Sequence, residues 1–175
     1  MIVYGRNTVS EALKSNYSVK ALYLEENIKK DHRIEDILNQ AKKHSPKVEY
    51  TSNKILQKIT LTQEHQGVAC EVDFREFKFN DIKWDNDKAY IYISEATFEQ
   101  NVGAIIRTAE CAGFGGVIIP NNIKITPTIA KISTGALFHI PIIKYPIYQT
   151  IKEFKKEEVK SVLNKNKELI YLFEK

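Results

Sequence analysis

Hydrophobic residues in the first 73 positions recur in short runs that alternate between helical and extended spacing. Val9, Ala12 and Leu13 form a helical stripe, and Thr8-Val9-Ser10-Glu11 fits a capping box with Thr8 as N-cap. A second helix is predicted over 31–44, with a capping residue in front, and a short one over 52–59. Strands are predicted over 19–24, 48–50 and 67–72. The pattern therefore predicts an α/β unit that ends near Asp73.

Residues 74–88 have no steady period. Phe74, Phe77, Phe79 and Trp84 are scattered among charged residues. This pattern favours a linker whose aromatic side chains pack against a neighbouring unit. The alternative is a surface on which bases stack.

The apolar pattern becomes regular again at position 89. A nearly continuous apolar run over 89–93 is typical of a strand buried in a parallel sheet, and a helix over 101–112 and a strand over 116–120 complete a βαβ unit. A helix that starts at Thr126-Pro127, a strand over 140–143 and a helix over 149–160 are expected to follow. The chain is thus divided into residues 1–73, a linker over 74–88 and a second unit over 89–175.

Composition narrows the class of protein only slightly. The 175 residues are 43% hydrophobic and 27% charged, as in ordinary globular proteins, and no apolar run is long enough to span a membrane. The start has no signal-peptide design. Cys70 and Cys111 are interpreted as free core thiols in a reducing compartment, which favours the cytoplasm. The four histidines are too widely separated to indicate a metal site, and the net charge of +4 permits nucleic-acid binding without establishing it.

The segment from Ser94 to Arg107 is the strongest candidate for chemistry. A strand leads into a polar turn over 94–101, at the sheet edge where open α/β folds bind ligands, and Gly103 then allows close backbone approach. Arg107 is the only arginine after Arg75, and its planar fork suits phosphate in a way that lysine does not. It also follows an apolar stretch, where an idle charge would be costly.

Each polar residue of this segment also has a purely structural interpretation. Arg107 could instead form a surface salt bridge with Glu110 or Glu99, and the residue pattern does not decide between the two. Asn101 could cap the helix, a role that is compatible with facing a ligand. No predicted strand is followed by G-x-G-x-x-G or G-x-x-x-x-G-K-[ST], which disfavours a generic nucleotide-binding domain.

Four segments, in order, resemble the SpoU (TrmH-type) RNA 2′-O-ribose methyltransferases. In chain order, these segments are Val3-Tyr4-Gly5-Arg6-Asn7-Thr8-Val9-Ser10-Glu11, His65-Gln66-Gly67-Val68-Ala69, Asn101-Val102-Gly103-Ala104-Ile105-Ile106-Arg107-Thr108-Ala109 with Gly113-Phe114-Gly115-Gly116, and Lys131-Ile132-Ser133-Thr134-Gly135-Ala136-Leu137-Phe138-His139-Ile140-Pro141. The resemblance covers about residues 1–150. A single motif would be weak, but four in the family's order and spacing are specific.

The resemblance implies both a fold and an activity. It implies a small N-terminal α/β substrate-binding domain and a mostly parallel α/β domain of the SPOUT (trefoil-knot) type, usually as a homodimer. It also implies methyl transfer from S-adenosylmethionine to a ribose 2′-hydroxyl, with Asn101 and Arg107 as catalytic residues. Arg6, Asn7, His65 and Gln66 are the implied RNA-binding residues. By analogy, an appended N-terminal domain favours ribosomal over transfer RNA. The rival hypothesis is a non-catalytic RNA-binding module.

Two further family motifs, which form the knot and bind most of the cofactor, are not found. Five of the seven glycines lie between Gly103 and Gly135, and none follows. Tight cofactor-binding turns call for glycine, so no cofactor-binding residue is assigned. Three explanations are open: a truncated or frameshifted member, part of a longer polypeptide, or a short protein that retains RNA binding alone. Without the knot, strands 90–93 and 117–119 are expected to present exposed edges, and the isolated chain to be poorly soluble or to associate.

Overall fold

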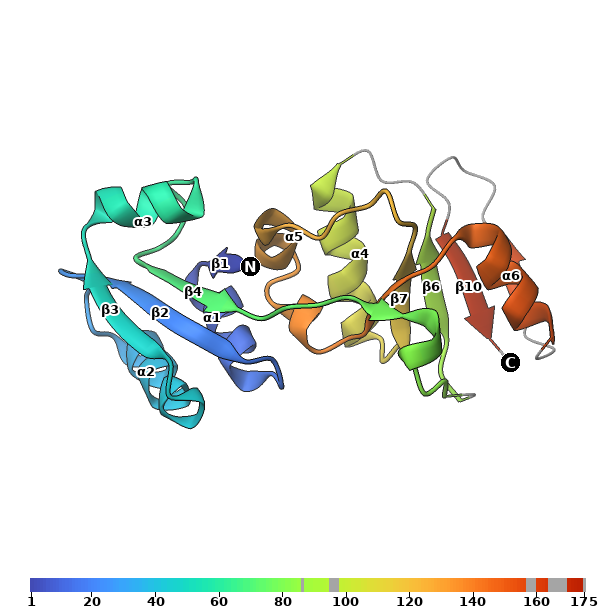
Figure 1. Cartoon of the computed structure of the whole chain (residues 1–175), viewed down its shortest axis with the longest axis horizontal. Coiled ribbons are helices and arrows are strands. Elements are labelled where there is room, and N and C mark those ends of the chain that lie inside the picture. Colours follow the sequence, from blue (N-terminus) through green and yellow to red (C-terminus); the bar gives the residue numbers. More distant parts are fainter. Residues whose placement is uncertain (86, 95–97, 157–159, 164–169, 175) are drawn as a thin grey trace. The chain divides into compact units, whose positions relative to one another are not determined.

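The chain folds as two compact units. Each unit is made of two segments that are distant in the sequence. A computed structural model describes residues 1–174 except 86, 95–97, 157–159 and 164–169 (Figure 1). Unit 1 comprises Met1–Phe74 and Thr126–Phe138, and unit 2 comprises Arg75–Ile125 and His139–Lys175. The sequence-based division assigned all residues after 88 to the second unit, whereas residues 126–138 pack within unit 1.

Unit 1 is a four-stranded sheet with helices on both faces. Its elements are β1 (Ile2–Tyr4), α1 (Arg6–Lys14), β2 (Val19–Glu25), α2 (His32–His44), β3 (Lys47–Thr51), α3 (Asn53–Thr60), β4 (Val68–Val72), α5 (Pro127–Ile132) and the 3-10 helix η2 (Ala136–Phe138). The strand order is β1-β4-β2-β3, and only the pair β2–β3 is parallel. Figure 1 shows α3 on the opposite side of the sheet from α1 and α2.

Strand alternation divides the core of unit 1 between these two faces. Tyr4 and Ala69 pair across β1 and β4 and pack with Leu56 of α3. Leu22 and Leu24 flank Tyr23 in β2, so they point to the other face, and both are fully buried. Each face of the sheet therefore has its own helix layer, as the predicted α/β pattern requires.

The predicted caps of the first two helices of unit 1 differ in outcome. Asp31 caps α2 as expected, because its side chain accepts a hydrogen bond from the main-chain N–H of Ile34. The capping box at Thr8 is wrong: α1 begins at Arg6 after Gly5, and Thr8 is a buried residue inside the helix. Gly5 is the N-cap and adopts a φ of 88°, which a side chain rarely tolerates, so the helix begins three residues earlier than the polar pattern indicated.

Residues 126–138 form the last layer of unit 1. As predicted, α5 begins with Pro127 at its first position after a Thr126 cap, whose hydroxyl accepts from the N–H of Ile129. The helix contacts β1 and α1, and η2 brings Phe138 against the rings of Tyr17 and Phe74. Phe74 thus belongs to the core of unit 1.

Unit 2 is a six-stranded sheet with α4 and α6 on opposite sides (Figure 1). Its elements are β5 (Phe77–Lys78), the 3-10 helix η1 (Phe79–Asp81), β6 (Tyr90–Ile93), α4 (Glu99–Cys111), β7 (Gly116–Ile119), β8 (Ile142–Lys144), α6 (Ile147–Lys156), β9 (Lys160–Leu163) and β10 (Ile170–Glu174). The strand order is β5-β8-β7-β6-β10-β9. The first four strands run parallel, which confirms the predicted βαβ unit.

Aromatic side chains of the predicted linker complete the core of unit 2. Phe79 lies 4.2 Å, centroid to centroid, from Tyr145 and 4.5 Å from Trp84, and Trp84 contacts Tyr90 and Phe154. These rings pack on the buried cluster of β6, β7, β8 and α6. The packing interpretation is therefore confirmed over the base-stacking one.

The C-terminal segment departs from the predicted helix and supplies strands. The helix ends at Lys156 and Lys160 lies in β9, while residues 157–159 lie outside the described part of the chain. The strand β10 pairs antiparallel with β6, with Tyr92 opposite Tyr171, and β7 lies between β6 and β8. The expectation that strands 90–93 and 117–119 present exposed edges is therefore wrong, because each has two neighbours.

The two cysteines have different surroundings. Cys70 in β4 is a free, fully buried thiol, as predicted. Cys111, at the end of α4, is exposed, so its assignment to the core is wrong. The buried stripe of α4 runs through Val102, Ile106 and Ala109, and Cys111 lies outside it.

Candidate functional sites

An open polar depression of about 730 Å³ in unit 1 contains most of the residues implied for RNA binding; we call it the polar pocket. Its wall is made by the end of β2, the loop before α2, the start of α3 and the loop before β4. Arg6, His65 and Gln66 line it directly. Asn7 is connected to it, because its side-chain oxygen accepts from Nη1 of Arg33, a lining residue, at 3.1 Å.

The residues of the polar pocket form a hydrogen-bonded network. The side-chain oxygen of Gln66 accepts from the main-chain N–H of Arg6 at 3.0 Å, and the guanidinium of Arg6 pairs with Asp31. The main-chain N–H of Ile34 lowers the pKa of Asp31, and hydrogen bonding from Arg6 lowers it further. Asp31 therefore stays ionised at neutral pH, and much of the Arg6 charge is compensated within the pocket.

His65 is an unusual member of this wall because it is only 2% exposed. Its Nδ1 accepts a hydrogen bond from the main-chain N–H of Gly67 at 3.0 Å. A neutral imidazole whose Nδ1 accepts carries its proton on Nε2. That Nε2 is buried and has no partner among the described residues, so one hydrogen-bond donor of the pocket wall is unsatisfied.

Several pocket residues were not identified from the sequence. They are Glu25, Asn27, Lys29, Asp31, Arg33, Asn53 and Gln63. They come from separate segments without a shared motif, and only the β2–β4 pairing and the N-terminus of α3 bring them together. Asp31 did carry a sequence signal, but as a helix cap only.

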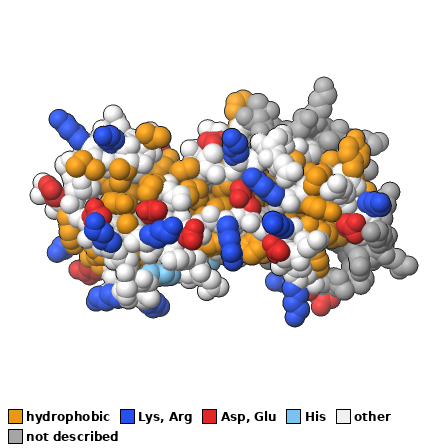
Figure 2. Space-filling model, viewed as in Figure 1, with side chains coloured by type: hydrophobic (Ala, Val, Ile, Leu, Met, Phe, Trp, Pro, Cys, Tyr) orange, Lys and Arg blue, Asp and Glu red, His pale blue; other side chains and the backbone are white. Residues whose placement is uncertain are grey.

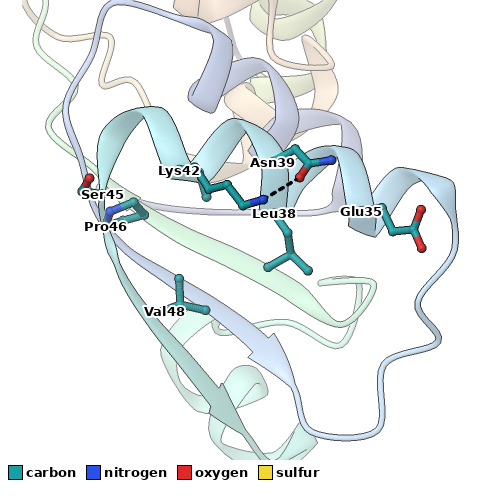
Figure 3. A pocket seen from close by; sticks show the side chains of 8 residues that line it. Glu35, Leu38, Asn39, Lys42, Ser45, Pro46 and Val48 are labelled. Atoms are coloured by element: carbon teal, nitrogen blue, oxygen red, sulfur yellow. Dashed lines mark hydrogen bonds between the residues drawn. The ribbon is translucent and has the colours of Figure 1, made fainter.

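A second open depression in unit 1 lies between α2 and β3 and is shown in Figure 3. Leu38, Pro46 and Val48 supply its apolar part, while Lys42 donates a hydrogen bond to Asn39 at 3.1 Å along its rim. It contains no residue of the predicted sites.

In unit 2 the second candidate site lies where β6 ends and α4 begins. Residues 95–97 of the predicted polar turn lie outside the described residues. The helix cap is Phe98, which makes no side-chain cap bond, so the interpretation of Asn101 as the cap is wrong. Asn101 is the third residue of α4 and is half-buried. Ser94, directly after β6, has a buried hydroxyl without a partner among the described residues.

Arg107 lies in the second half of α4 and is exposed. The apolar residues around it in sequence point to the core, so its charge is not buried and that part of the argument for a site is wrong. Within the described part of unit 2, Arg107 forms no ion pair with Glu99 or Glu110. Helix geometry puts Arg107 about 9 Å along the axis from Asn101 and about 120° around it, so the two side chains do not share one face.

Two glycines, Gly115 just before β7 and Gly116 as its first residue, test whether this part of the sheet leaves space for a cofactor. A Cβ on Gly115 would lie 2.6 Å from the hydroxyl oxygen of Tyr90, and one on Gly116 would lie 3.0 Å from Cδ1 of Ile143. Side chains of unit 2 already fill the space that these glycines leave. The two glycines therefore serve close packing of the sheet, and they do not form a cradle for a bound group.

Neither the charge pattern of the surface nor the grouping of potential metal ligands points to a further site among the described residues. Lysines and acidic residues are interspersed on the visible face, without a large patch of one sign (Figure 2). Among the described residues, no three His, Cys, Asp or Glu side chains are grouped so that they could hold a metal ion. None of the described helices is both long and apolar enough to cross a membrane.

Comparison with known proteins defines the class of the two units. Residues 2–78 match the family model described as RNA 2′-O ribose methyltransferase substrate binding, and residues 88–171 match the SpoU rRNA Methylase family. The fold is that of the SPOUT methyltransferases. AviRb from Streptomyces viridochromogenes, solved with the cofactor AdoMet, aligns with a TM-score of 0.73 at 18% identity over 90% of this chain and 60% of its own. An RNA 2′-O ribose methyltransferase aligns with a TM-score of 0.73 at 15% identity over the same shares.

Relatives at higher identity identify the family. A putative TrmH family tRNA/rRNA methyltransferase of Bacillus subtilis, YacO, is 31% identical over 90% of this chain and 66% of its own length. One of Staphylococcus epidermidis is 33% identical over 89% of this chain and 65% of its own. The chain belongs to the SpoU (TrmH-type) methyltransferase family, and it spans about two thirds of the length of these relatives.

Proposed function

We propose that the chain acts in methyl transfer from S-adenosylmethionine to a ribose 2′-hydroxyl of structured RNA. The description of the family model matched by residues 2–78 supports the ribose hydroxyl as target. The relatives are named for both transfer and ribosomal RNA, and the N-terminal unit favours ribosomal RNA by analogy only. As in the family, we expect the working form to be a homodimer.

The observation that carries the RNA-binding part of this proposal is the convergence of Arg6, His65 and Gln66 on the polar pocket. They come from two segments about 60 positions apart, within the residues matched by the substrate-binding model. Asn7 joins them through Arg33. We assign RNA binding by unit 1 to these four residues and their neighbours in the pocket.

In unit 2 we assign the methyl-transfer step to α4. When bound, S-adenosylmethionine supplies the methyl group. Arg107 is exposed and offers five donors in a plane, so it can hold the phosphate beside the target ribose and hydrogen-bond the 2′-oxygen. A guanidinium with a pKa above about 12 is a poor base near neutrality, so its role is to position the RNA. Asn101, near the start of the helix, is assigned to holding the geometry of the site.

No described residue is assigned to the cofactor. The side chains of Tyr90 and Ile143 fill the space beside Gly115 and Gly116, and the backbone of β10 pairs with β6. These two observations favour the second candidate function, a non-catalytic RNA-binding module. The two functions share the RNA and differ in cofactor binding.

Calorimetry with S-adenosylmethionine, together with transfer of a labelled methyl group to RNA, separates the two candidates. Micromolar cofactor binding and methyl transfer support the enzyme, whereas RNA binding without either supports the binding module. Arg107→Ala should weaken RNA binding and abolish transfer, and Arg107→Lys should recover only part of the affinity.

Lys124→Ala removes another exposed cation of unit 2 and serves as the control. If Arg107→Ala leaves RNA affinity and methyl transfer at the level of Lys124→Ala, the role assigned to Arg107 is wrong.

A further inference from the structure

The polar pocket is lined by two carboxylates, Glu25 and Asp31, together with the cations Arg6, Lys29 and Arg33. Asp31 pairs with Arg6, whereas Arg33 donates to the neutral side-chain oxygen of Asn7. A ligand that contacts the carboxylates must donate hydrogen bonds to them, because ionised carboxylates only accept. The amino and imino groups of a base are such donors, and a phosphate diester has none.

Side-chain amides give the pocket both donors and acceptors at close range. Asn27, Asn53, Gln63 and Gln66 line it, and Nδ2 of Asn53 donates to Oε1 of Glu25 at 3.1 Å. Amide and carboxylate groups are among those that proteins use to bind the hydrogen-bonding edges of bases. A base within a duplex already uses its Watson–Crick edge, so only an unpaired base could present that edge here.

The unsatisfied Nε2–H of His65 provides an independent indication of a ligand. It belongs to a ring that is 2% exposed and lines the pocket, and its other nitrogen is fixed by Gly67. Leaving a buried donor without an acceptor costs roughly 1–3 kcal/mol. A carbonyl oxygen or ring nitrogen of a base is an acceptor of the kind that this donor lacks.

We infer that the polar pocket binds one unpaired nucleobase of the RNA and reads its edge through Glu25, Asn53, Gln63 and His65. This inference rests on the proposed function, because it specifies the RNA feature that unit 1 holds. Duplex regions of the same RNA would contact unit 1 through their phosphates only, at surface cations.

The test compares two labelled RNAs of equal composition, a stem–loop and a fully paired duplex, by fluorescence anisotropy with the full chain. Asn53→Ala and Gln63→Ala should each weaken stem–loop binding by about fivefold or more and leave duplex binding unchanged. Because a neutral base is contacted, the dependence of affinity on salt concentration should stay the same.

Two control variants calibrate this result. Lys54→Ala removes an exposed cation of α3 outside the pocket, and it should weaken the binding of both RNAs and reduce the salt slope by about one. Asn39→Ala removes an exposed amide of α2 outside the pocket and should change neither affinity. Circular dichroism of each variant checks that unit 1 remains folded.

Failure of the inference can be distinguished from failure of the proposed function. Suppose that both RNAs bind the wild-type chain. If Asn53→Ala and Gln63→Ala then leave the stem–loop affinity unchanged, or lower the affinity for both RNAs equally, the pocket does not hold a base. If neither RNA binds, RNA recognition itself is wrong, and the inference falls with it.

Discussion

Gly135 lies so close to Glu11 that no side chain fits between them: a Cβ on Gly135 would overlap the Cβ of Glu11 and lie 2.8 Å from its Cγ. Gly135 also adopts a φ of 90°, which disfavours any other residue. This close approach fixes the end of α5 and the start of η2 against α1. Two segments more than a hundred residues apart in the sequence are thereby joined in one core.

Gly135→Ala should destabilise unit 1 by more than about 2 kcal/mol, since it adds a steric overlap to a backbone strain of roughly 1–2 kcal/mol. Gly113→Ala is the matched control, because Gly113 has a similar φ of 76° with no atom within 4 Å of its would-be Cβ. Gly113→Ala should therefore lower the free energy of unfolding only by the backbone strain of a residue with positive φ. Urea unfolding followed by circular dichroism measures both, and equal losses would show that the contact with Glu11 contributes nothing.

Asp31→Asn should remove part of the dependence of stability on pH. Since the pKa of Asp31 is lowered in the folded state, its contribution to stability is fully present above the unfolded pKa of about 3.9 and is lost as the pH falls through the folded pKa. Asparagine can still cap α2 but does not titrate. The difference in the free energy of unfolding between the wild type and the variant should therefore shrink as the pH falls below about 5.

The measurement is denaturant unfolding across that pH range, with Glu35→Gln as the control, because Glu35 is an exposed carboxylate of the same helix that takes part in none of the described ion pairs. A wild-type advantage over Asp31→Asn that persists undiminished at acid pH would contradict the linkage.

The two thiols should differ sharply in reactivity. Burial raises the pKa of Cys70 to about 12, so it has almost no thiolate at pH 8, and reagent cannot reach it. Cys111 is exposed. Iodoacetamide at pH 8 should label Cys111 alone in the native protein and both cysteines in urea, as peptide mass spectrometry would show. Native labelling of Cys70 at the rate of Cys111 would disprove its burial.

Phe79→Ala should destabilise unit 2 by about 2–3 kcal/mol, below the range for a fully buried phenylalanine because Phe79 is only half-buried. It removes the stacked contact with Tyr145 and one wall around Trp84. Trp84 is the only tryptophan of the chain, so its emission reports on this cluster. A red shift and an earlier unfolding midpoint are expected, and Phe79→Leu should retain most of the stability.

Removal of residues 157–175 should make the chain associate. The backbone of β10 satisfies one edge of β6, whose four residues are all buried, and deletion would leave that edge open. Size-exclusion chromatography and light scattering would show larger species than for the 175-residue chain. A monodisperse, cooperatively unfolding truncated chain would mean that β10 is dispensable.

The sequence predicted the individual elements well because their signals are local. Asp31 before an apolar stripe and Thr126 before Pro127 mark helix starts, and both are found where expected. The Thr8 box failed because the same letters fit the interior of a helix whose start is set by the backbone of Gly5. The path of the C-terminal segment was missed because β10 depends on pairing with β6 and β9 depends on pairing with β10, and neither pairing has a local sequence signal.

The candidate sites were only partly predictable. Motif resemblance supplied Arg6, His65 and Gln66, which the fold brings together. Spacing alone could not find Glu25, Asn53 or Gln63, because their proximity depends on how the strands pair. It also could not show that Arg107 faces solvent, since that depends on which side of α4 meets the sheet.

The division of unit 1 into two segments has a consequence for how the chain is made. The first 74 residues leave the ribosome without the α5–η2 segment, which ends 64 residues later at Phe138. At about 5–20 residues per second, that interval lasts roughly 3–13 s. During it, β1 and α1 lack the layer that α5 and η2 provide, while β5, β6 and β7 are being synthesised. Unit 1 can therefore begin to fold first, but its folding cannot be completed until much of unit 2 has been translated.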